Sequence, residues 1–217
     1  EDKEDLITNA EFAQLMYNSN YQGFTPPKTP LVTSTFSNKK ITLTWDKSSI
    51  YSKDVLTGYS DFEGYRIYRS GDGGQTWGSI ENKIYDQNGK FYSWRPYAQF
   101  DLTATEDSTH CLKGFTHDGC VDDLFRGESI RGEDPYAPWI NLGNNSGLPN
   151  INEFNQFVFI DTNVVNGVEY TYSVTAYDMG ISPQHVNYTQ SENGTFISDT
   201  TYIANPDKWG QPNGYSS

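Results

Sequence analysis

The chain has 217 residues and a formal net charge of −13, from 15 lysines and arginines against 28 aspartates and glutamates. Such an acidic surface repels nucleic-acid phosphates and anionic membranes, and no apolar run approaches the ~20 residues that span a bilayer. We therefore expect no nucleic-acid partner and no membrane insertion. Hydrophobic residues are only 35% of the chain, but 15% of the chain is aromatic, and each ring can bury a large area.

The N-terminal part carries Leu6, Ala10, Ala13 and Tyr17 at helical spacing, which predicts a short helix within residues 4–18. The proline-rich stretch FTPPKTP follows and cannot continue a helix. We expect residues 1–25 to form an N-terminal helix and linker. Because the chain begins with Glu rather than Met, we expect a processed product or a part of a larger protein.

From Leu31 onward apolar and polar residues alternate, which is the pattern of half-buried strands. Strands are predicted in KKITLTWD, EGYRIYRS, QFVFID, VEYTYSVTAYD and GTFISDTTYIA. TWGSIENKIYD is expected to pair back on EGYRIYRS as a hairpin, and SPQHVNY to be a loop. These segments predict an all-β, antiparallel β-sandwich.

The alternation fails between about residues 86 and 155, where glycine, aspartate, asparagine and proline are frequent. A structureless loop of that length is unusual inside a domain, so we expect a folded insertion. The resulting division is a sandwich over residues 26–205 with this insertion, followed by a polar linker over residues 206–217.

The two cysteines, Cys111 and Cys120, lie in the short stretch THCLKGFTHDGC. In a secreted protein the natural interpretation is one local disulfide. His110 and His117 make zinc an alternative, but no CxxC pair occurs and the ligand spacing is poor. Free thiols are the third alternative.

Three segments resemble the fibronectin type III family. PPKTPLVTSTFSNKKITLTWD, ending its second strand near Trp45, is similar to the family's opening, and FEGYRIYRS to its third strand, with Tyr65 and Ile67 inward. FIDTNVVNGVEYTYSVTAYD resembles the late signature, with Tyr170 at the tyrosine-corner position and Val174 following. The resemblance implies a fibronectin type III-like sandwich, here with a long insertion and a short N-terminal helix, in which the Tyr170 hydroxyl bonds to the backbone.

More narrowly, DFEGYRIYRSGDGGQTWG, AQFDL and DPYAPWINLG resemble modules of large secreted surface proteins of bacteria. That resemblance implies export, a multidomain parent protein and no known catalysis.

Ser70, Asp72, Gly74 and Trp77 match the Asp-box pattern S-x-D-x-G-x-x-W, of which sialidases carry several copies. The box is a hairpin device in which the serine and aspartate bind the turn backbone and the aromatic ring packs beneath it. A glycosidase is the alternative interpretation, but a single copy favours the structural role.

Carboxylates crowd the insertion, where a solvated surface, a calcium site or acid–base catalysis are the alternatives. If calcium binds, we expect Asp118, Asp122 and Asp123 to be its ligands. The insertion's aromatic residues form either a small core or a sugar-binding platform, for which Trp94, Tyr97 and Trp139 are the candidates.

The chain has no G-x-S-x-G, H-E-x-x-H or phosphate-loop motif. We expect a non-catalytic structural, adhesion or assembly module of a secreted or cell-surface protein. No cofactor is required, with Ca²⁺ as the candidate ion. The expected partners are other domains of the parent protein, neighbouring subunits or surface glycans. A carbohydrate-binding accessory module is the alternative, ahead of a glycosidase fragment.

Overall fold

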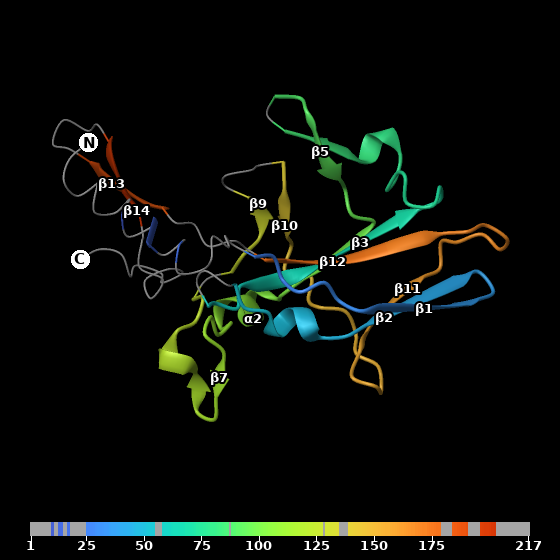
Figure 1. Cartoon of the computed structure of the whole chain (residues 1–217), viewed down its shortest axis with the longest axis horizontal. Helices are drawn as coiled ribbons and strands as arrows, with labels where there is room; N and C mark the ends of the chain where they lie inside the picture. Colours follow the sequence, from blue (N-terminus) through green and yellow to red (C-terminus); the bar gives the residue numbers. More distant parts are fainter. Residues whose placement is uncertain are drawn as a thin grey trace.

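The computed structural model describes residues 25–54, 58–86, 88–127, 129–134 and 139–178, the strands at 184–190 and 196–202, and the single positions 10, 13, 14 and 17. The chain is mostly β, built from several small antiparallel sheets and one short helix (Figure 1). No barrel closes within these residues, and none of their helices is long and apolar enough to cross a membrane. The predicted helix at 4–18, apart from the four single positions, and the predicted linker at 206–217 lie outside the described residues.

Two three-stranded antiparallel sheets form the body of the molecule. The first has the order β1-β2-β11, with β1 at Val32–Ser37, β2 at Lys40–Trp45 and β11 at Phe157–Asp161. The second has the order β12-β3-β6, with β12 at Thr171–Asp178, β3 at Phe62–Ser70 and β6 at Ala98–Asp101.

The remaining elements are short. Four two-stranded sheets pair β4 (Lys83–Tyr85) with β5 (Phe91–Trp94), β7 (Phe115–Thr116) with β8 (Gly119–Cys120), β9 (Gly132–Glu133) with β10 (Asn141–Gly143), and β13 (Gln184–Gln190) with β14 (Phe196–Tyr202). An α-helix, α2, spans Ala104–Ser108, and short 3₁₀ turns lie at Ser48–Tyr51, Ile80–Asn82 and Val121–Asp123.

Side chains from both three-stranded sheets meet in one core. Trp45 of β2 packs edge-on against Tyr65 of β3, with ring centroids 5.5 Å apart, and Phe157 of β11 lies 5.3 Å from Tyr65. Strand alternation places these rings inward, because side chains of one strand point to opposite faces in turn. The buried core comprises Leu43, Trp45, Phe62, Tyr65, Ile67, Leu102, Phe157 and Val174.

The predicted strands in five segments are confirmed as β2, β3, β11, β12 and β14. Three expectations need correction. Residues 83–85 pair with β5 rather than with β3, and residues 184–190 form a strand rather than a loop. Ala98–Asp101, inside the range expected to be an insertion, extends the second sheet by pairing with β3. Strand pairing depends on contacts distant in sequence, which a local pattern does not contain.

The insertion also covers the outer face of the second sheet. Tyr177 of β12 points away from the core, yet it is only 7% exposed. Its hydroxyl donates to the backbone oxygen of Leu142 in β10 at 2.6 Å, and the Arg66 guanidinium stacks 3.8 Å from its ring centroid. The segment that contains β10 is therefore packed onto the second sheet rather than projecting freely from it.

The variant Trp45→Ala tests the shared core. Removing a fully buried indole between the two sheets leaves a cavity, which costs about 3–5 kcal/mol of unfolding free energy. Urea denaturation followed by far-ultraviolet circular dichroism measures the loss. The control Ile80→Ala, at a side chain that is 74% exposed, is expected to change it by less than about 0.5 kcal/mol. Equal effects of the two variants would contradict the assigned core.

Candidate functional site

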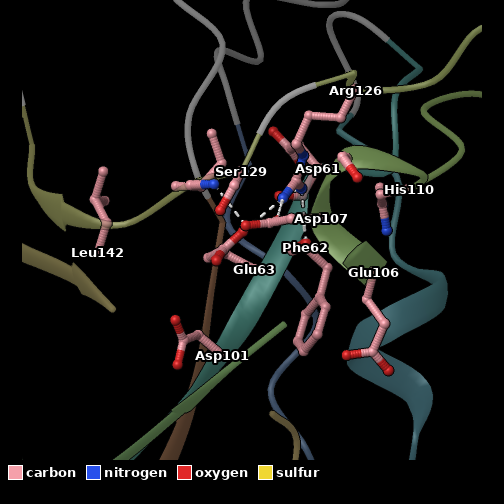
Figure 2. A network of polar contacts seen from close by, with 12 residues as sticks. Asp61, Phe62, Glu63, Asp101, Glu106, Asp107, His110, Arg126, Ser129 and Leu142 are labelled. Carbon is pink, nitrogen blue, oxygen red and sulfur yellow. Dashed lines mark hydrogen bonds and ion pairs between the residues drawn. The ribbon is translucent and has the colours of Figure 1, made fainter. Parts of the chain in front are cut away.

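A buried polar cluster lies where the insertion meets the start of β3 (Figure 2). Arg126 occupies its centre, and its side chain is 1% exposed. Its Nη1 donates to Glu63 Oε2 at 2.6 Å and also to Asp107 Oδ1, and both carboxylate side chains are 0% exposed. Its Nη2 donates to the backbone oxygens of Asp61 and Phe62 at 3.2 and 3.0 Å.

Local structure positions both insertion residues of this cluster. Asp107 lies in α2, which begins with a reciprocal capping box between Thr103 and Glu106. Its second oxygen, Oδ2, accepts the backbone N–H of Ile130 at 2.6 Å. Arg126 is held by its own backbone N–H, which donates to the oxygen of His110 at 2.9 Å. The insertion thus presents a preformed pair to β3.

The disulfide between Cys111 and Cys120 lies beside this pair. It closes a short loop that contains β7 and β8, and Cys111 forms an isolated bridge with Phe125, next to Arg126. Closing a loop of about ten residues stabilises the folded chain by about 3 kcal/mol on the chain-entropy account. The predicted disulfide is confirmed, and the pairing removes the two thiolates that a zinc site would need.

Burial sets the protonation of the cluster. Desolvation raises the pKa of Glu63 to about 8, although the positive charge of Arg126 acts in the opposite direction. Desolvation also raises the pKa of Asp61 to about 7, and the negative charge of Asp178 adds to this shift. Desolvation lowers the pKa of His110 to about 4, although its Nε2 lies 2.7 Å from the backbone oxygen of Ser60. The raised pKa of Glu63 favours its protonated form at neutral pH, which lowers the negative charge buried beside the Arg126 guanidinium.

This cluster is built to hold the fold together. Its three central side chains are at most 1% exposed, so a substrate cannot reach them in this conformation. Among the described residues, Glu63 Oε1 and Arg126 Nε have no hydrogen-bond partner. Through Arg126 the cluster joins the insertion to Glu63 and Phe62 of β3 and to Asp61 just before it, while Asp107 holds Arg126 from within the insertion. We therefore assign it to docking of the insertion.

A second polar cluster joins the two main sheets at their other end. The Asp161 carboxylate of β11 accepts Arg69 Nη1 at 2.9 Å, Tyr172 Oη at 2.7 Å and Tyr97 Oη at 3.0 Å. Burial opposes ionisation of Asp161, but these hydrogen bonds outweigh it and lower its pKa. The Arg69 guanidinium also stacks 4.0 Å from the centroid of Tyr97. The anion at Asp161 therefore ties β11 to β3 and β12.

The Asp-box residues form a closed turn after β3. Ser70 Oγ donates to Asp72 Oδ1 at 2.6 Å and accepts the N–H of Gly74 at 2.9 Å. Asp72 also accepts the backbone N–H of Thr76 at 2.9 Å, and hydrogen bonds from Ser70 and Thr76 lower its pKa to about 2. Trp77 packs edge-on against Tyr68 of β3, with centroids 6.3 Å apart. Every one of these contacts stabilises the turn.

Asp118, Asp122 and Asp123 are exposed in the β7–β8 region. Asp122 Oδ2 lies 3.4 Å from Lys113 Nζ. Among the described residues no group of three or more histidine, cysteine, aspartate or glutamate side chains is arranged to hold a metal ion. The structure does not bring the three aspartates together as a ligand set, so calcium binding there stays a prediction without geometric support.

Trp94, Tyr97 and Trp139 take separate places instead of forming one platform. Trp94 packs edge-on against Phe91 within the β4–β5 hairpin, at 5.6 Å. Trp139 packs edge-on against Tyr92 at 5.9 Å, which joins that hairpin to the segment before β10. Tyr97 belongs to the cluster around Asp161.

The docking cluster was not identified from the sequence. In the sequence Asp107 is one of many carboxylates of the insertion, and no motif around Arg126 distinguishes it from other arginines. One signal was present in EGYRIYRS, because Glu63 shares a strand face with Tyr65 and Ile67. A carboxylate on a buried face requires a proton or a cation, and that requirement points to an arginine from elsewhere in the chain. Comparison with protein-family models, curated proteins and solved structures finds no significant match to this chain.

The variant Glu63→Gln tests the protonated carboxyl, since the neutral amide has the same shape. A raised pKa in the folded state stabilises the fold at low pH, and this contribution is lost as pH rises from the unfolded value of 4.5 through about 8. Between pH 7 and 8.5 we expect the wild-type unfolding free energy to fall by up to about 1.4 kcal/mol per pH unit. Near pH 7 Asp61, whose folded pKa is about 7, steepens this fall, and His110, which still binds some protons in the unfolded chain, opposes it. The interval from pH 7.75 to 8.5 therefore reports mainly on Glu63.

Urea midpoints at pH 7, 7.75 and 8.5 measure this slope. Glu63→Gln is expected to flatten it, whereas the exposed control Glu133→Gln keeps the wild-type slope. If the Glu63→Gln variant keeps the wild-type slope, a group other than Glu63 loses the proton in this pH range.

The variant Arg126→Met tests the docking role. It leaves Asp107 buried without its cation, and breaking such a pair costs about 3–5 kcal/mol. Urea denaturation at pH 7 measures the loss, and the exposed control Arg131→Met is expected to have little effect. A loss as small as that of the control would show that the insertion stays docked without the guanidinium.

Proposed function

We propose that the chain is a non-catalytic structural or assembly module with a fibronectin type III-like sandwich, belonging to a secreted or cell-surface protein. The proposal rests on the structural roles of the chain's polar clusters. Arg126 docks the insertion, Asp161 joins the two main sheets, and Asp72 closes a turn. Charged groups committed to such internal contacts suit a rigid building unit.

Two features support the fibronectin type III-like assignment. The two three-stranded sheets share one core, in which Trp45 and Tyr65 lie at the places that the resemblance implies. The Tyr170 hydroxyl accepts the backbone N–H of Val165 at 3.2 Å, which is the contact expected of a tyrosine corner.

The disulfide indicates an oxidising setting, because thiols are kept reduced in the cytosol of most cells. The surface charge of −13 keeps such a module soluble in that setting and repels nucleic acids. Both observations support secretion or display at the cell surface.

Carbohydrate binding is the second candidate, because the β4–β5 hairpin exposes Tyr85, Phe91 and Tyr92 by 46%, 45% and 52%. The rings stand edge-on to one another, with 78° between Tyr85 and Phe91 and 69° between Phe91 and Trp94. Sugar stacking requires a flat, exposed face, so this geometry favours the structural module.

The test combines a turnover panel with a glycan array, using the intact chain. We expect no hydrolysis of glycosides, esters or peptides and no glycan signal. Hydrolysis that is abolished by one carboxylate substitution would overturn the proposal in favour of an enzyme. A glycan signal lost in Tyr92→Ala but kept in Phe154→Ala, at a residue 74% exposed in another loop, would favour the carbohydrate-binding module.

A further inference from the structure

Residues 108–127, which we call the disulfide lobe, form a separate part of the insertion. The disulfide lobe contains β7, β8 and the disulfide, and it projects away from the two main sheets (Figure 1). Its Cys111, Leu112 and Leu124 are 3%, 1% and 9% exposed, and among the described residues they lie outside the core cluster that the main sheets share. Apolar burial apart from the main core is typical of a unit that can open locally.

Residues 108–112 form the middle layer of the disulfide lobe and contact the segment just before β3. The backbone N–H of Ser60 donates to the oxygen of Leu112 at 2.6 Å, and His110 Nε2 lies 2.7 Å from the backbone oxygen of Ser60. Together with the Arg126 guanidinium, these contacts hold the lobe against the start of β3.

Residues 124–127 pair with the other side of the same middle layer. The backbone N–H of Leu112 donates to the oxygen of Leu124 at 3.1 Å, and that of Arg126 donates to the oxygen of His110 at 2.9 Å. The backbone that carries the Arg126 guanidinium is therefore positioned by the middle layer. If the two stretches separate, the guanidinium loses its place beside β3.

The disulfide constrains the chain that connects these two stretches. Cys111 belongs to the middle layer and Cys120 ends β8, so the bond shortens the flexible path from Leu112 to Leu124. Without the bond, closing that longer path costs conformational entropy. Cys111 is buried and Cys120 is half-buried, so a thiolate from solvent has its access at the Cys120 sulfur.

We propose that the Cys111–Cys120 bond is a redox switch, whose reduction by a dithiol opens the disulfide lobe while the two main sheets stay folded. Opening separates Arg126 from Glu63, so the docking of the insertion depends on an oxidising environment. This inference goes beyond the proposed function, because it holds whatever the module assembles with or binds.

The reduction is an ordinary thiol–disulfide exchange. One thiolate of the dithiol attacks the Cys120 sulfur, and the Cys111 thiolate leaves and takes up a proton. The second thiolate attacks the reagent's own sulfur in the mixed disulfide and releases Cys120, which is protonated in turn. The dithiol is thereby oxidised to a disulfide, and the chain gains two electrons and two protons.

The test is hydrogen–deuterium exchange of the full-length chain, read by mass spectrometry with and without dithiothreitol. A mass gain of two hydrogens before labelling verifies the reduction. We expect peptides from the middle layer and from residues 124–127 to exchange roughly a hundredfold faster in the reduced chain, which is the loop constraint lost on the chain-entropy account. Peptides from β2 and β11 are expected to exchange as before.

Four outcomes of the reduction would overturn the proposal. Equal acceleration in β2 and β11 would show that the bond supports the whole fold. Acceleration confined to residues 113–120 would show that the bond only closes the β7–β8 turn. Unchanged exchange throughout the disulfide lobe would show that the lobe stays closed without the bond. A bond that dithiothreitol reduces only in urea would show that the folded chain offers no switch.

The variant Arg126→Met links the redox switch to docking. In the oxidised chain this variant is expected to accelerate exchange in the same peptides as reduction does, because both changes weaken the closed lobe. The matched control Arg131→Met, at an exposed arginine, is expected to exchange as the wild type does. Acceleration of a different set of peptides by Arg126→Met would separate docking from the disulfide and overturn the proposal. If Arg126→Met does not fold, the reduction of the wild-type chain decides alone.

Discussion

The packing of Trp45, Tyr65 and Phe157 between two small sheets is the interaction on which the rest of the structure depends. A chain with few aliphatic residues must obtain its core area from rings, and three rings from three strands bring both sheets together. This arrangement orients β3 so that its first residues meet the insertion and its last residues meet Asp161. The position of both polar clusters thus follows from the aromatic core.

In this protein buried charged side chains join separate segments of the chain, a role that apolar residues have in a larger core. Arg126 is buried with two carboxylates, a costly arrangement that requires each charge to be paired or protonated. The raised pKa of Glu63 serves that requirement, because a protonated Glu63 places one fewer buried anion beside Arg126. Around Asp161 the hydrogen-bond donors stabilise the anion instead. The two clusters hold opposite ends of β3 by different electrostatic means.

The two sheets that Asp161 joins also border a groove of about 280 Å³. Phe36 of β1, which is 91% exposed, and Tyr172 of β12 both line this groove.

The sequence by itself determined the strands with clear alternation, the disulfide and the Asp-box turn, because each depends on residues close together in the chain. VEYTYSVTAYD became β12, and Ser70 and Asp72 closed their turn within a few residues. Only the tertiary structure decided that β6 joins β3, that β4 does not, and that Glu63 meets Arg126, 63 positions away. These contacts join distant segments, and their free energy depends on burial and strand pairing, which exist only once the chain has folded.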